Sequence, residues 1–180
     1  MVGQYVIEDI ARGKVRVELA SEFRYRSPIL SPSMLVIVIS QSGETADTLA
    51  AVRLAKEQKV RTLAIVNVVG SSIAREADSV LYTKAGPEIS VATTKAYSAQ
   101  LIAGYMLAMG LAKAKGRLDV QTERAFISEL ESLPEKIRKI LSDEKKIQWL
   151  ATKVAAREEL FFVGRGIDYA ISMEGSLKLK

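Results

Sequence analysis

The sequence contains no cysteine and no histidine. Without cysteine, the chain can form neither a disulfide framework nor a thiolate metal site, and it has no cysteine nucleophile. Without histidine, it lacks the commonest general base and the commonest metal ligand. Any chemistry must therefore use serine, threonine, lysine, carboxylates and backbone amides, and we expect neither a metal nor a cofactor.

Long apolar runs and clustered positive charge are also missing. A membrane helix needs roughly 20 apolar residues, and polar side chains interrupt the longest candidate, residues 91–114. Aromatic residues make up only 6%, and the basic residues are dispersed, unlike those of a nucleic-acid binder. We find no secretory signal. We therefore expect a cytoplasmic protein that binds neither membranes nor nucleic acid. Its net charge of +5 suits an anionic ligand or a well-solvated surface.

The order of apolar runs and turns predicts an α/β fold. Residues 34–39, 62–66 and 79–82 are rich in strand-forming residues, typical of parallel strands covered on both faces. Helices are predicted between them, over residues 45–58 and 73–76. This alternation predicts a doubly wound parallel sheet flanked by helices.

The remaining segments are predicted to be mostly helical. Helices are expected over residues 2–11, 91–114, 120–141, 144–157 and 167–180. Two further strands are expected over residues 15–19 and 160–163. Residues 20–26 lead towards Ser27-Pro28 and are expected to form a connection rather than a helix. Pro134 is expected to disturb its helix.

These patterns divide the chain into three predicted parts. Residues 1–115 form an α/β domain that lacks its first strand and loop, residues 116–158 a helical connector, and residues 159–180 the start of a second α/β domain. The first helix has no strand before it, and the last has no glycine or proline stop. We therefore expect both ends to be cuts in a larger protein, and we expect the open sheet edge to favour self-association.

A polar segment, SQSGETADT, follows the first central strand at residues 40–48 and contains a turn. Ligands of open parallel sheets bind at the carboxyl ends of strands, and a helix N-terminus suits a phosphate. Gly43 lets the backbone approach a ligand closely. The turn offers hydroxyls and a carboxamide, at Ser40, Ser42, Thr45 and Gln41. Taken alone, the same residues are about equally well explained as a capped helix.

Two further motifs carry candidate residues. The segment AGPEISVATTK, residues 85–95, also joins a strand to a helix, and its backbone around residues 91–93 could line the same cleft. In isolation, a helix cap is the favoured interpretation. Glu174 and Lys178 lie four residues apart on one helix face. Their spacing favours a surface ion pair over a unit that moves protons near a sugar.

Together, these motifs resemble the isomerase part of the glutamine–fructose-6-phosphate aminotransferase family, which is built from sugar isomerase (SIS) domains. The matching stretches, in the family's order, are ASEFRYR (20–26), SQSGETADT (40–48), NVVGSSIAREAD (67–78), AGPEISVATTKAY (85–97) and GRGIDYAISMEGSLKLK (164–180). The resemblance implies that glutamine-derived ammonia adds to fructose 6-phosphate. A ketose-to-aldose proton shift then yields glucosamine 6-phosphate.

The resemblance also implies residue roles and partners. Substrate binding is implied for Ser40, Gln41, Ser42, Thr45, Val91 and Thr93. Catalytic roles, in the acid/base network of the isomerisation, are implied for Glu174 and Lys178. The implied partners are the sugar phosphate and a second copy of the chain, in a homodimer without a cofactor.

Several features of the family are missing from this sequence. They include a CGTS-like sugar-site loop, the ring-opening histidine, the Schiff-base lysine and the cysteine-led glutaminase domain. We therefore expect this chain alone to be inactive, with weak sugar-phosphate binding at most. Two alternatives stay open: a sugar-phosphate-sensing SIS module of a regulator, and a related sugar-phosphate deaminase or deglycase.

Overall fold

A computed structural model of the 180-residue chain describes residues 1–89 and 93–179. Its contacts divide the chain into two compact units. One unit comprises Lys14–Leu107, and the other joins Met1–Gly13 to the segment that starts at Ala108. The sheet lies wholly within the first unit, which we call the sheet unit.

The sheet unit is built on three parallel strands in the order β1 (Leu35–Ser40), β2 (Arg61–Val66) and β3 (Ser79–Tyr82). Ser40 lies opposite Val66, and Val66 lies opposite Tyr82. All three strands therefore end at the same edge of the sheet. The turns that follow them meet there.

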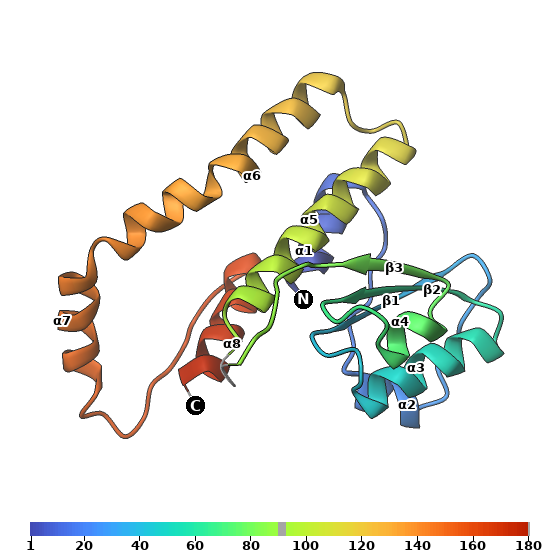
Figure 1. Cartoon of the computed structure of the whole chain (residues 1–180), viewed down its shortest axis with the longest axis horizontal. Coiled ribbons are helices and arrows are strands. Elements are labelled where there is room, and N and C mark those ends of the chain that lie inside the picture. Colours follow the sequence, from blue (N-terminus) through green and yellow to red (C-terminus); the bar gives the residue numbers. More distant parts are fainter. Residues whose placement is uncertain (90–92, 180) are drawn as a thin grey trace. The chain divides into compact units, whose positions relative to one another are not determined.

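Two helices, α3 (Ala46–Glu57) and α4 (Ser72–Glu76), cover one face of this sheet (Figure 1). Because side chains alternate along a strand, every second residue of each strand points towards these helices. The core between the layers consists of Val38, Val52, Ala64, Val66 and Ile73. Burial of each large aliphatic side chain contributes about 1.5–3 kcal/mol. A short helix, α2 (Ala20–Tyr25), packs against α3.

The other unit is helical. Its helices are α1 (Val2–Ile10), the end of α5 (Lys95–Ala114), α6 (Val120–Leu141), α7 (Glu144–Val154) and α8 (Ile167–Leu179). α1 packs against α8. Asp119 caps α6, since its carboxylate accepts the Thr122 N–H at 2.8 Å. α6 continues through Pro134, where the missing N–H removes one intrahelical hydrogen bond.

The α/β class and the parallel sheet flanked by helices are confirmed. Two strand predictions are wrong, because residues 15–19 and 160–163 form no strand. A strand persists only with a hydrogen-bonded neighbour. Among the described residues, β1, β2 and β3 pair only with one another. Phe161 and Val163 are instead 86% and 89% exposed.

Two helix predictions also need correction. Residues 20–26 are not merely a connection, because Ala20–Tyr25 is helical. Proline restricts only the residue before it, so Pro28 leaves room for this turn of helix. The long helix predicted from residue 91 begins at Lys95, after Thr93 with a left-handed φ of 50°. Within the described part of the chain, no helix is long and apolar enough to cross a membrane.

Candidate functional site

The polar turn after β1 lies at the carboxyl edge of the sheet. Ser40, only 7% exposed, ends the strand. Its Oγ accepts the Gly43 N–H at 3.0 Å and lies 3.1 Å from Thr45 Oγ1. These contacts close residues 40–45 into a compact turn directly before α3. We call this segment the polar turn.

The polar turn presents polar groups beside a helix N-terminus. Thr45 has an extended backbone, and its side chain makes no capping hydrogen bond with the described residues. The first-turn amides of α3, including those of Ala46 and Asp47, have no partner inside the helix. Such amides and the positive end of the helix dipole attract an anion. Ser42 Oγ accepts the Glu44 N–H at 3.2 Å, but Glu44 lies before the helix, so this bond stabilises the turn and does not cap α3.

The first residues of α4, which follow the loop after β2, are hydrogen-bonded to the polar turn. The Gly43 carbonyl accepts the Ile73 N–H at 3.0 Å. The Glu44 Oε1 accepts the Ser72 N–H at 2.8 Å. Hydrogen bonds from the Ser72 hydroxyl and amide hold the pKa of Glu44 below its ordinary value. Glu44 is therefore a charged anchor between the polar turn and the N-terminus of α4.

The loop after β3, residues 83–89, lies at the same edge, because β2 and β3 end side by side. Glu88 Oε2 accepts the Ala96 N–H at 3.1 Å and so satisfies an amide at the start of α5. Thr93 lies two residues before the start of that helix and has a left-handed backbone. Val91 lies outside the described residues, so its predicted place in the sugar pocket has no structural account.

Glu174 and Lys178 form an ion pair on α8, with 2.8 Å between Oε1 and Nζ. Their side chains are 23% and 30% exposed, so water partly screens the pair. The geometry is that of the surface pair indicated by their spacing. It also leaves a carboxylate beside an ammonium group, as a proton-handling unit requires. Their catalytic role stays a prediction.

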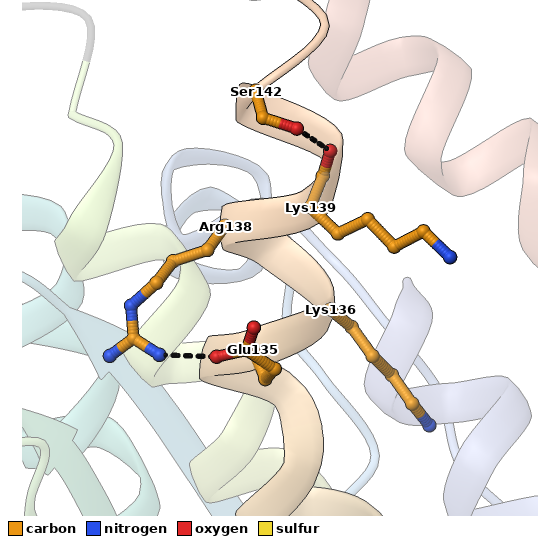
Figure 2. A pocket seen from close by; sticks show the side chains of 5 residues that line it. All are labelled: Glu135, Lys136, Arg138, Lys139 and Ser142. Carbon is orange, nitrogen blue, oxygen red and sulfur yellow. Dashed lines mark hydrogen bonds and ion pairs between the residues drawn. The ribbon is translucent and has the colours of Figure 1, made fainter.

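A hollow of about 440 Å³ lies on the helical unit (Figure 2). Its lining comes from one end of α6: Glu135, Lys136, Arg138, Lys139 and Ser142. These side chains are exposed, and Arg138 Nη1 donates to Glu135 Oε2 at 2.8 Å. None of the predicted site residues lines this hollow. We locate the candidate site at the sheet edge, where the polar turn and the loop after β3 meet.

Sequence reasoning missed two residues of this edge. Glu44 links the polar turn to α4, and Asn67 links the polar turn to the loop after β3. Neither residue is among the predicted site residues. The available signal for Asn67 was its place directly after a buried strand, as for Gln41 after β1. No local pattern marked Glu44, because its partner Ser72 is 28 residues away.

Comparisons with known proteins show the family of this chain. The profile of the SIS domain family matches residues 1–110. Proteins named glutamine–fructose-6-phosphate aminotransferase [isomerizing] match the whole chain. The relative from Clostridium tetani is 54% identical over 180 residues, and that from Mycolicibacterium paratuberculosis is 50% identical over 181 residues. This chain spans 30% and 29% of their respective lengths.

A solved structure of a protein with a similar name also matches this chain. It is the C-terminal domain of glucosamine-fructose-6-phosphate aminotransferase from Francisella tularensis, with a TM-score of 0.96 and 40% identity. The match covers 99% of this chain and 51% of that structure. The fold therefore matches a known one over nearly its whole length.

Proposed function

We propose a function for this chain on the basis of its family, because it belongs to the SIS domain family. The chain is proposed to be the sugar-phosphate-binding isomerase domain of an enzyme that forms glucosamine 6-phosphate. That enzyme uses fructose 6-phosphate and glutamine-derived ammonia. The observation that carries the proposal is the polar turn, residues 40–45, held at the carboxyl edge of a parallel sheet and before α3. The names of the relatives that match this whole chain support the choice of reaction.

The polar turn is proposed to bind the phosphate group. The hydroxyls of Ser42 and Thr45 and the free amides of α3 donate hydrogen bonds to its oxygens, which are strong acceptors. Ser40 keeps the turn closed, and its hydroxyl is proposed to bind the sugar phosphate. Gln41 contacts a sugar hydroxyl. Val91 and Thr93 line the sugar pocket.

Glu174 and Lys178 are proposed to serve the isomerisation. The reaction moves a proton between adjacent sugar carbons, so a base must take it from one carbon and return it to the next. Glu174 is proposed to belong to this acid/base network, together with the ammonium group of Lys178 that lies beside its carboxylate.

The remaining predictions complete the proposal. The enzyme is a cytoplasmic homodimer without a cofactor. Within the chain, residues 1–115 belong to a first SIS domain, residues 116–158 to a helical connector, and residues 159–180 to the start of a second SIS domain.

Calorimetric titration with fructose 6-phosphate tests the proposed function. The protein should have the length of the matched aminotransferases and carry this chain. We expect saturable binding that inorganic phosphate weakens by competition, while unphosphorylated fructose produces no comparable heat. Equal binding of fructose and fructose 6-phosphate would overturn the proposal, because the polar turn would then not recognise a phosphate.

A further inference from the structure

Asn67 connects the loops that follow all three strands. It stands directly after β2, and its main-chain N–H donates to the Gln41 carbonyl of the polar turn at 3.2 Å. Its side chain reaches the opposite way, to the loop after β3. There its Nδ2 donates to the Gly86 carbonyl at 2.7 Å.

The carboxamide oxygen of Asn67 accepts two hydrogen bonds from the same loop. Its Oδ1 accepts the Thr83 hydroxyl at 3.1 Å and the Ala85 N–H at 2.8 Å. A carboxamide carries its donor and its acceptor on separate atoms, so it can donate to one group while it accepts from two others. Aspartate would keep the two acceptor contacts and lose the donor to Gly86, and alanine would lose all three.

The loop from residue 83 to residue 89 has no regular secondary structure. Its backbone therefore depends on such side-chain partners for its shape. Gly86 adds a left-handed turn, with φ of 72°. Glu88 of this loop accepts the Ala96 N–H at 3.1 Å, so the position of the loop is linked to the start of α5.

We propose that Asn67 is a positioning residue that couples the polar turn to the loop of residues 83–89, and thereby sets the sugar end of the site relative to the phosphate end. The proposal rests on the proposed function of this edge. Asn67 does not touch the substrate. It acts through the main chain of Gln41 on one side and through Ala85 and Gly86 on the other.

A graded series of variants tests this coupling in the aminotransferase-length protein that carries this chain. Asn67→Ala leaves the main-chain bond to Gln41 and removes every side-chain contact. Asn67→Asp retains the acceptor contacts, and Thr83→Val removes one of them while preserving shape. We expect the Ala85 amide to exchange with solvent about tenfold faster in Asn67→Ala. It should stay protected in Asn67→Asp, and the Ala64 amide within β2 should not change in any variant.

Kinetics separate positioning from general stability. Asn67→Ala should raise the KM for fructose 6-phosphate about tenfold, with a smaller change in kcat, and Thr83→Val should fall between it and wild type. A variant that merely unfolds would lose apparent kcat at unchanged KM.

Each failure has its own signature. Unchanged exchange at Ala85, or faster exchange with unchanged KM, overturns the role of Asn67. A wild-type protein that does not bind fructose 6-phosphate overturns the proposed function instead.

Discussion

The hydroxyl of Ser71 occupies the space that a side chain at Gly43 would need. A Cβ built on Gly43 would lie 2.1 Å from Ser71 Oγ and 2.6 Å from Ser71 Cβ. Ser71 is only 3% exposed, so it has little room to move aside. This close approach lets the Gly43 carbonyl reach the Ile73 N–H. The polar turn and the loop after β2 therefore depend on a glycine at position 43.

Gly43→Ala should destabilise the protein and distort the polar turn. The residue has φ of 68°, and a left-handed backbone costs an alanine about 1–2 kcal/mol; the clash with Ser71 adds to this. Gly70→Ala is a matched control, because Gly70 has φ of 72° and none of the described atoms lies within 4 Å of its built Cβ. In urea denaturation, Gly43→Ala should lose more unfolding free energy than Gly70→Ala. Equal losses of unfolding free energy in the two variants would show that Ser71 does not crowd a side chain at position 43.

Ser71→Ala should leave stability unchanged or raise it. Among the described residues, Ser71 Oγ is a buried side-chain atom without a hydrogen-bond partner. A buried unsatisfied hydroxyl costs about 1–3 kcal/mol, and alanine removes it while leaving the backbone in place. The midpoint of thermal unfolding measures the effect. A clear drop in that midpoint would mean that the hydroxyl has a partner, such as an ordered water.

The Glu44 anchor should make stability depend on pH. Its folded-state pKa lies below the ordinary 4.5, because Ser72 donates hydrogen bonds to the carboxylate. The resulting stabilisation is therefore present above about pH 4.5 and is lost as the pH falls through the folded pKa. Glu44→Gln keeps an acceptor for Ser72 and does not titrate. The difference in unfolding free energy between wild type and Glu44→Gln should shrink from pH 7 to pH 3. A difference that stays constant would contradict the anchor.

The central sheet is predictable from sequence because its strands are short runs of strand-forming residues, half of which face α3 and α4. The apolar run at residues 79–82 coincides with β3, and the periodic segment at residues 120–141 coincides with α6. Burial on the helix-covered face leaves a strong local pattern. The segment of residues 160–163 has equally strong strand-forming residues, but pairing partners are not a local property. That prediction therefore fails where no neighbouring strand is present.

The same distinction applies to the candidate site. The position of Ser40 through Thr45 follows from a local rule, since a polar turn between a buried strand and a helix lies at the sheet's carboxyl edge. The role of Asn67 depends on residues 16 to 19 positions away. Such contacts follow only from the register of β2 and β3. The spacing of four residues on a helix predicts the Glu174–Lys178 ion pair. The chemical role of the pair depends on groups that are distant in the sequence.

Thr45→Val should weaken sugar-phosphate binding with little effect on folding. Thr45 is exposed, and its Oγ1 contacts only the Ser40 hydroxyl among the hydrogen-bond partners described for it. Valine keeps the shape and removes the donor. A hydrogen bond to a charged group contributes about 1.5–3 kcal/mol, so the Kd for fructose 6-phosphate should rise about tenfold or more. Unchanged affinity in calorimetry, with an intact unfolding midpoint, would place the phosphate elsewhere.

Glu174→Gln should slow the reaction of the aminotransferase-length protein without weakening substrate binding. A positioned acid or base contributes about 10²–10⁴-fold to the rate, so kcat should fall at least about a hundredfold. Asp168→Asn is the matched control, because it replaces an exposed carboxylate on the same helix α8 and should leave kcat unchanged. If Glu174 and Lys178 are only a surface pair, their interaction is worth about 0.3–0.5 kcal/mol. Glu174→Gln would then resemble Asp168→Asn in both kcat and KM, and the catalytic assignment would fail.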